Sequence, residues 1–439
     1  MTKIYVDINH VKDVIVLPRL KYTLDFIQNH PCAPENIKWI HDPYLADVTI
    51  QYGFPNSSLS IPFINFCFCD DHSQIPKHIN DAWKDIIISG FTSEKITNGY
   101  SSPVDIFQTI FYHISRYEEW YNKSAQTDIH GLMPSKDHFL VNQGIHDIPV
   151  VDYLVYYFYD LIGQKPKKLE SLYILTHDID AIRRFPSFYK FLRAIANVIF
   201  YQQFKWTKLL KLFSNFIKVL IDKEADPYDT FDWLLHTNHP KIVERKIYFL
   251  SGGKTKFENY YRISDPRCRP VYELCRKNGY EFGIHPSYLS GDNDQIILSE
   301  KSFLEKTTGQ KIDHSRQHFL RYKIKSTGKI LESLGIETDS SFGYRDKTGF
   351  RCGTGFPYRM YNFDEERPYT FLEIPLIVMD MSIIHEFGWD ADQFIRHLEA
   401  FLEKNKYYTQ ITFNFHNSTF DPTLIDAVKM KAHYLKLFT

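Results

Sequence analysis

Two carboxylates stand two positions apart in the segment THDID, which follows the apolar run LYIL. Alternate side chains of an extended chain point to the same side, so Asp178 and Asp180 are expected to project together. Adjacent carboxylates repel each other, and a bound divalent metal relieves that repulsion. One carboxylate could then ligate the metal while the other serves as a base. The alternative is a strand end followed by an Asp that caps a helix.

Three further segments carry residues suited to the same chemistry. His285, in GIHPSY, is either a neutral imidazole ligand or a packed histidine. Arg316, in SRQHFLRY, could hold a carboxylate and keep it ionised, unless the segment is a surface charge run. The same segment contains His318. His416, in FNFHN, suits a general acid because an imidazole titrates near neutrality.

Most of these segments end apolar runs that have the character of strands. The runs are LYILTHDID, RKIYFLSGG, YEFGIHPSY, LEIPLIVMD and YTQITFNFHN, and polar residues and helical stretches separate them. Alternating units of this kind build parallel sheets and barrels, whose strands converge at their carboxyl ends. The pattern therefore predicts a shared site there. Residues 339–362, rich in glycine, aromatics and arginine, are either part of a carbohydrate groove or a plain structural loop.

Residues 1–165 have a different pattern, which predicts a smaller α/β domain of unknown role. Its expected strands are KIYVDI, VTIQYGF, SIPFINFCF and DIIISGF, and its expected helices are RLKYTLDFIQNH, DIFQTIFYHISRYEEWY and VVDYLVYYFYDLIG. The polar stretch GQKPKK, which contains a proline, marks the boundary. Residues 166–439 are assigned to the second domain.

An insertion at about 181–240 separates the first two strands of the second domain. Between Ala181 and Ile221 there are eight basic residues and no acidic one, while the rest of the chain carries about −9. Large apolar residues recur at helical spacing in this window. The segment is either a helical hairpin packed on the barrel with solvated lysines or a basic amphipathic element that contacts a membrane peripherally.

Composition narrows the classes of protein further. The 439 residues suggest two or three domains, and the net charge of −1 argues against a dedicated nucleic-acid binder. The six cysteines form no CxxC pair, which favours a reducing compartment. No run of residues is long and apolar enough to span a bilayer, and the N-terminus lacks the apolar core of a signal peptide. A cytoplasmic location is therefore expected, with contact at the inner membrane face as an option.

Taken in order, the motifs resemble those of the polysaccharide deacetylases (NodB homology, carbohydrate esterase family 4-like). THDID resembles the first motif of that family, IHPSY the second and SRQHFLRY the third. DSSFGYRDKTGFRCGTGFPYR with LEIPLIVMD resembles the fourth, and FNFHN the fifth. The resemblance covers residues of about 170–439. The residues of the motifs are most similar to those of an atypical branch whose members carry an extra N-terminal domain.

The resemblance implies an α/β fold: a distorted (β/α) barrel of the deacetylase type, preceded by the smaller α/β domain. It implies hydrolysis of an N-acetyl group, with O-acetyl as the second choice, on a sugar or glycan precursor. In its terms Asp178 is the base, Arg316 holds it and His416 is the acid. Asp180, His285 and His318 would bind a divalent metal, with zinc as the first choice.

This sequence departs from the family pattern at two places. The usual adjacent Asp-Asp pair is spaced here by Ile179, which leaves the base and ligand roles of the two aspartates exchangeable. The usual second metal histidine would fall on Leu289, which cannot ligate. His318 is the first replacement, and His177 and Ser287 are the others. These departures keep a second reading open, a non-catalytic glycan-binding or assembly protein on a degenerate barrel.

Overall fold

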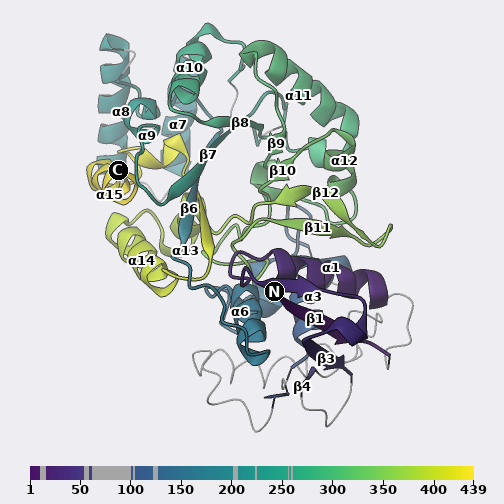
Figure 1. The fold of residues 1–439 in the computed structure, drawn as a ribbon. Helices are drawn as coiled ribbons and strands as arrows, with labels where there is room; N and C mark the ends of the chain where they lie inside the picture. The colour runs from purple at the N-terminus through teal and green to yellow at the C-terminus, as the bar shows by residue number, and fades with distance from the viewer. Residues whose placement is uncertain are drawn as a thin grey trace. The chain divides into compact units, whose positions relative to one another are not determined.

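The structure is a computed structural model, and the chain divides into two compact units (Figure 1). It describes residues 1–9, 16–53, 59–61, 100–101, 104–121, 127–200, 206–222, 225–255, 257–258 and 261–439. Unit 1 is Met1–Ser171 with Gly349–Pro375 and Asn405–Gln410, and unit 2 is Leu172–Thr348 with Leu376–Lys404 and Ile411–Thr439. Two later segments of the chain therefore belong to the unit that begins at the N-terminus.

Unit 1 contains a parallel sheet with the strand order β2-β1-β3-β4-β5. The strands are β1 (Thr2–Asp7), β2 (Ile37–Trp39), β3 (Val48–Tyr52), β4 (Leu59–Ile61) and β5 (Tyr100–Ser101). The helices are α1 (Val16–Asn29), α3 (Ile106–Ile114), α4 (Tyr117–Tyr121), α5 (Phe139–Asn142) and α6 (Val150–Leu161). An antiparallel pair, β11 (Tyr358–Asn362) and β12 (Arg367–Glu373), comes from a later segment.

Aromatic side chains form the core of unit 1. The ring of Phe107 on α3 lies 5.1 Å from that of Tyr52 on β3 and 5.8 Å from that of Phe158 on α6. The strands expected at KIYVDI and VTIQYGF and the helices expected at RLKYTLDFIQNH and VVDYLVYYFYDLIG are confirmed. The tract DIFQTIFYHISRYEEWY forms two helices, α3 and α4, with Arg116 between them at a positive φ of 58°. Most of SIPFINFCF and all of DIIISGF lie outside the described residues.

Unit 2 is built on a curled sheet that includes the strand order β10-β9-β8-β7-β6-β14-β13 (Figure 1). Strands β6 to β10 pair in parallel, as do β13 and β14. The strands are β6 (Leu172–Ile179), β7 (Ile242–Phe249), β8 (Glu281–Ile284), β9 (His314–Ser315), β10 (Thr338–Asp339), β13 (Val378–Met379) and β14 (Gln410–Asn414). Neighbouring parallel strands bring their carboxyl ends to one edge, which is where polar residues end the apolar runs.

Helices connect these strands, as the alternating pattern predicts. They are α7 (Phe188–Phe200), α8 (Trp206–Ile221), α9 (Phe231–Leu234), α10 (Arg269–Lys277), α11 (Asp294–Thr308), α12 (Thr327–Ser333), α13 (Asp380–Phe387), α14 (Ala391–Lys404) and α15 (Ala427–Phe438). Strand β6 is buried along all but its first residue, because neighbouring strands flank it and its sheet is covered. The α/β class is therefore confirmed.

The insertion between β6 and β7 is helical, as its periodicity predicts. Helices α7 and α8 pack through a small apolar cluster in which the rings of Phe191 and Phe216 stack 3.8 Å apart. Lys205, one of the eight basic residues of the window, lies outside the described residues. No helix in the described parts of the chain is long and apolar enough to cross a membrane.

Candidate active site

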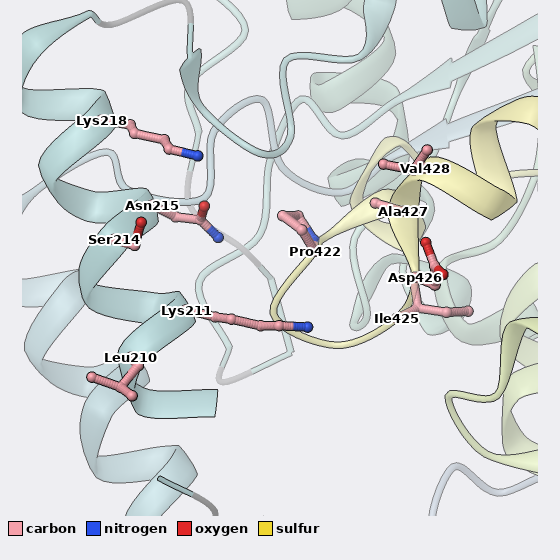
Figure 2. A pocket seen from close by; sticks show the side chains of 10 residues that line it. All are labelled: Leu210, Lys211, Ser214, Asn215, Lys218, Pro422, Ile425, Asp426, Ala427 and Val428. Atoms are coloured by element: carbon pink, nitrogen blue, oxygen red, sulfur yellow. The ribbon is translucent and has the colours of Figure 1, made fainter. Parts of the chain in front are cut away.

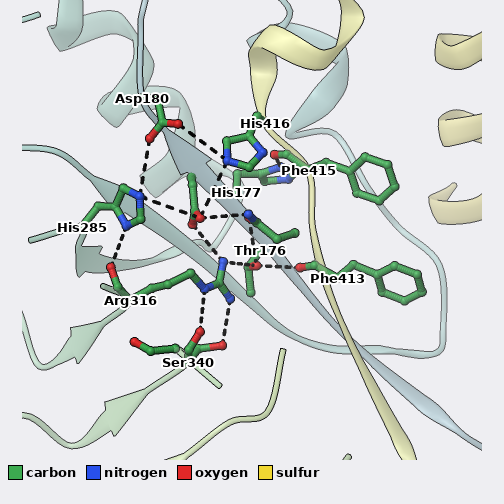
Figure 3. Close-up of polar contacts among 12 residues, drawn as sticks. Thr176, His177, Asp180, His285, Arg316, Ser340, Phe413, Phe415 and His416 are labelled. Carbon is green, nitrogen blue, oxygen red and sulfur yellow. Dashed lines mark hydrogen bonds and ion pairs between the residues drawn. The ribbon is translucent and has the colours of Figure 1, made fainter. Parts of the chain in front are cut away.

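The two aspartates of THDID, Asp178 at the carboxyl end of β6 and Asp180 just beyond it, face the same two imidazoles. Figure 3 shows Asp180 between His285 and His416. One oxygen of Asp178 lies 4.0 Å from His285 Nε2, and one oxygen of Asp180 lies 3.4 Å from the same nitrogen. On the other side, His416 Nε2 lies 4.0 Å from Asp178 and 3.7 Å from Asp180. The first, second and fifth motifs therefore meet at one point.

Arg316 is completely buried and reaches Asp178 through a salt bridge of 2.8 Å. Its remaining N–H groups donate to Thr176 Oγ1 at 2.8 Å and to the carbonyl and hydroxyl oxygens of Ser340 at 2.9 and 2.8 Å. The guanidinium also stacks over the ring of Tyr248, 4.4 Å from its centroid. These contacts fix the guanidinium, which consequently sets the orientation of the Asp178 carboxylate.

The charge state of Asp178 follows from the same contacts. Burial alone favours the neutral acid, but the Arg316 guanidinium and the nearby imidazoles hold the pKa of Asp178 below its usual range. The second carboxylate oxygen accepts a hydrogen bond of 2.8 Å from Asn414 Nδ2. Asp178 is therefore an ionised carboxylate with a fixed orientation, as a general base requires.

Asp180, His285 and His318 form a group that could hold a metal ion, with one ligand atom from each lying within 4.8 Å of the others. His285 Nδ1 donates to the Arg316 carbonyl at 2.6 Å, so its Nε2 is left to face Asp180. His318 Nε2 lies 3.8 Å from the same Asp180 oxygen. The structure thus brings together the three predicted ligands.

Two observations test whether this set fits a cation. Asp180 Oδ1 is buried without a hydrogen-bond donor, which is costly unless another group compensates it. Burial lowers the pKa of His318 to about 4, so this imidazole is neutral at physiological pH, as a ligand must be. One carboxylate and two imidazoles are also the ligand types that zinc takes at catalytic sites. The residues therefore fit a divalent metal.

The other two candidates for the third metal ligand, His177 and Ser287, make hydrogen bonds outside the site. His177 points away from the site: its Nδ1 donates to the Phe415 carbonyl at 2.8 Å, and Tyr280 and Tyr434 face its Nε2. His177 directly precedes Asp178 on the strand, and successive side chains of a strand point to opposite faces of the sheet. The Ser287 side chain hydrogen-bonds Glu300, and its backbone amide donates to the same carboxylate at 2.9 Å.

His318 owes its position to an unusual turn. It begins the short 3-10 helix His318–Leu320, in which Phe319 and Leu320 both have positive φ values, 59° and 53°. Residues with side chains seldom adopt this left-handed region, and such conformations concentrate at functional sites. The residues of the motif SRQHFLRY alone do not reveal this backbone conformation.

His416 is held by an aspartate that the sequence analysis did not single out. Asp380 Oδ1 accepts a hydrogen bond of 2.7 Å from His416 Nδ1, and Oδ2 accepts one of 2.6 Å from the His416 backbone amide. The Thr419 hydroxyl also donates to Asp380. Burial alone lowers the pKa of His416, but Asp380 outweighs it and raises the pKa to about 10. Asp380 ends the run LEIPLIVMD, so its position at a strand end was the available signal.

Residues 339–362 divide between the two units. Ser340 belongs to unit 2 and bonds Arg316, and the Ser341 hydroxyl accepts a hydrogen bond from the Gln317 amide. Arg351 belongs to unit 1, where it is buried and forms a salt bridge of 2.7 Å with Glu119. The first part of the segment therefore supports the site, whereas Arg351 serves the packing of unit 1.

Comparison with known proteins identifies a family for part of the chain only. Residues 10–167 match a family of unknown function, DUF7033. No curated protein matches the chain.

Several solved structures resemble the chain weakly. A protein of Mycobacterium smegmatis assigned as a polysaccharide deacetylase shares 13% identity and a TM-score of 0.32, over 61% of this chain and 84% of that one. An allantoinase shares 12% identity and a TM-score of 0.34, over 61% and 85%. A pseudoenzyme of carbohydrate esterase family 4 from Bacillus anthracis shares 10% identity and a TM-score of 0.26, over 61% of each chain.

Proposed function

We propose that the chain is a metal-dependent hydrolase that removes an N-acetyl group, with O-acetyl as the second choice, from a sugar or glycan precursor. Unit 2 would then be a distorted barrel of the polysaccharide deacetylase type. The observation that carries the proposal is the pairing of Arg316 with Asp178 beside the group Asp180, His285 and His318, with His416 on the opposite side. The resemblance of five motifs supports the same reaction.

Each side chain has a defined role in this proposal. Asp180, His285 and His318 would hold the ion, for which zinc is the first choice. When bound there, a divalent ion supplies Lewis acidity, which polarises a carbonyl and makes water a stronger acid. Asp178 accepts the proton of the attacking water, and Arg316 keeps its carboxylate ionised and oriented.

His416 performs the complementary proton transfer. Its Nδ1 is tied to Asp380, and its Nε2 faces the two aspartates. An amine is a poor leaving group unless its nitrogen is protonated, so His416 donates a proton to that nitrogen as the C–N bond breaks. His416 and the proposed ligand His285 thus flank the two aspartates from opposite sides.

The test combines metal analysis with an activity assay. The purified chain would be stripped with a chelator, reloaded with Zn²⁺, and assayed for acetate release from oligomers of N-acetylglucosamine and from O-acetylated sugars. Zinc uptake and zinc-dependent acetate release are expected. No metal uptake together with no acetate release from any of these sugars would favour the glycan-binding scaffold.

Two substitutions separate the roles within the site. Asp178→Asn keeps the shape of the side chain but removes the proton acceptor, so activity should fall at least ~100-fold with metal content unchanged. If metal is lost instead, the roles of Asp178 and Asp180 are exchanged. His318→Ala should weaken metal binding sharply, and Ser287→Ala is the matched control with a smaller effect. Unchanged metal affinity in His318→Ala would remove His318 from the ligand set.

A further inference from the structure

The outer face of the helical hairpin α7–α8 is apolar, although it is exposed. On α8 the large side chains Trp206, Leu210, Phe213, Ile217 and Leu220, here called the α8 stripe, are all exposed, Trp206 by 70% and Leu210 by 67%. Their spacing of three or four residues places them on one face of the helix. A separate set on α8, which includes Leu209 and Leu212, packs in the buried cluster with α7. Phe213 also contacts Phe191 of α7, with ring centroids 5.2 Å apart, so this member of the stripe contributes to the packing of the hairpin as well.

Helix α7 also carries exposed apolar side chains. Phe188, Leu192 and Ile199 follow a helical spacing and are exposed, while Phe191 and Val198 pack in the cluster. Soluble proteins seldom leave a contiguous apolar face of this kind without a partner. The hairpin therefore has two apolar faces, one internal and one directed outward.

The charged residues on α7 and α8 are all basic, namely Lys190, Arg193, Lys208, Lys211 and Lys218. The sequence from Ala181 to Ile221 contains eight basic residues and no acidic one. Partial burial and the neighbouring Arg193 both lower the pKa of Lys190, as expected where positive charges lie close together. The hairpin thus presents an apolar surface within a positive field.

A third face of α8 carries lysines and borders a cavity of about 680 Å³. Lys211 and Lys218 extend from α8 towards this cavity, which Leu210 also lines, and the facing wall includes Pro422, Ile425 and Asp426 (Figure 2). The long stems of lysines allow their ammonium groups to reach past apolar surface to anionic groups. An apolar stripe with lysines along its flank is the arrangement of helices that lie in membrane interfaces.

We propose that the hairpin α7–α8 docks on the surface of an anionic lipid bilayer, with the α8 stripe among the acyl chains and the lysines at the headgroups. The charge pattern selects this occupant, because anionic headgroups complement two helices whose five charged residues are all basic. A second copy of the hairpin would instead bring like charges together. This docking does not depend on the reaction catalysed by unit 2.

Vesicle sedimentation tests the proposal. The full-length protein would be mixed with vesicles of phosphatidylcholine, or of phosphatidylcholine with phosphatidylglycerol, at low and at high salt. It should pellet with the anionic vesicles only, and less at high salt, because salt screens the attraction. Trp206 should enter the apolar region, so fluorescence should shift to shorter wavelength in the wild type and much less in Trp206→Phe.

Two sets of variants separate the apolar and the electrostatic contributions. The stripe variant Leu210→Ser/Ile217→Ser/Leu220→Ser should bind anionic vesicles at least tenfold more weakly, as should the charge variant Lys208→Glu/Lys211→Glu/Lys218→Glu. The control variants carry three apolar-to-Ser or three Lys-to-Glu changes at exposed positions elsewhere in unit 2 and should bind as the wild type does. They are Leu298→Ser/Phe303→Ser/Met381→Ser and Lys277→Glu/Lys306→Glu/Lys325→Glu.

Three results would overturn the proposal. The first is a wild-type protein that stays in the supernatant with anionic vesicles at low salt. The second is an equal loss of binding in the control variants. The third is a wild-type dimer in sedimentation equilibrium that does not bind vesicles and becomes monomeric in the stripe variant, since the stripe would then be an interface between copies of the chain. Circular dichroism would confirm that each variant is folded.

Discussion

Each unit of the molecule contains a buried aspartate–histidine pair. The two pairs differ in the group that the other ring nitrogen of the histidine contacts. In unit 2, His416 bonds Asp380 through Nδ1, and its Nε2 faces two further carboxylates. In unit 1, His30 Nε2 lies 3.2 Å from Asp152, and its Nδ1 lies 3.0 Å from the sulfur of Cys32. The same pair of residue types is thus joined to a candidate reaction centre in one unit and to a packed thiol in the other.

The pair in unit 1 resembles a nucleophilic triad only in its composition. Cys32 is 1% exposed, and burial together with the nearby Asp152 raises the pKa of its thiol. The thiolate is the reactive form, so this cysteine is unreactive. The Cys32 amide also donates to His30 Nδ1, and Asp152 accepts hydrogen bonds from Thr409 and the Gly355 amide. His30, Cys32 and Asp152 therefore hold segments of unit 1 together. The role of an aspartate–histidine pair thus depends on the groups that surround it.

The largest expected difference between the two pairs is in activity. His416→Gln should reduce the proposed deacetylation about 10²–10⁴-fold, because the acid assigned to the leaving amine is lost. His30→Gln is the matched change in unit 1 and should leave the rate of the folded protein nearly unaltered. Steady-state kinetics of both variants, with circular dichroism as a check on folding, measures this. Equal losses of activity in His416→Gln and His30→Gln would show that the two histidines do not differ in function.

A smaller effect is expected from Asp380→Asn, which keeps His416 but removes its charged partner. Activity should fall about 10–100-fold, the range seen when the carboxylate partner of a metal-bound histidine is altered, because Asp380 orients His416 in the same way. The negative charge of Asp380 favours the protonated imidazole and raises its pKa to about 10, so its removal lowers that pKa. The acid form is then lost at lower pH, and the alkaline limb of the pH–rate profile should move down in pH. An unmoved limb would exclude His416 as the titrating acid.

In unit 1 the corresponding substitution should change stability and leave activity alone. Asp152→Ala leaves the buried Thr409 hydroxyl and Gly355 amide without their acceptor, which should cost about 2–4 kcal/mol of unfolding free energy. Hydrogen exchange of the α6 amides would report the loss within unit 1. Asp160→Ala, on the same helix but without these partners, should stay within about 0.5 kcal/mol of the wild type. Similar exchange in the two variants would show that the Asp152 contacts contribute little.

The smallest effect concerns the reactivity of Cys32, which should be close to zero. Iodoacetamide at mildly alkaline pH should label Cys32 only after a denaturant is added, because burial keeps the thiol protonated and out of reach. Mass spectrometry of the peptide that contains Cys32 measures the label. Rapid labelling of the native protein would give unit 1 a reactive cysteine and remove the contrast between the two pairs.

Most elements of the fold could be predicted from local patterns. The strand LYIL, the helices of unit 1 and the helical insertion follow from the spacing of apolar residues, which local physics constrains. The assignment of Gly349–Pro375 and Asn405–Gln410 to unit 1 could not be predicted, because no local signal distinguishes them from their neighbours. Contacts between distant segments, such as Arg351 with Glu119, make that assignment.

The sequence by itself determined which residue types end the strands of unit 2, since the pattern of each run fixes where it ends and which side chains share a face. It therefore indicated Asp178, Asp180, His285 and His416 as one group. Only the tertiary structure decided their partners. Arg316 meets Asp178 across 138 positions of sequence, and Asp380 meets His416 across 36. The physical reason is that the strand order brings these residues together, and the strand order depends on the packing of the whole unit.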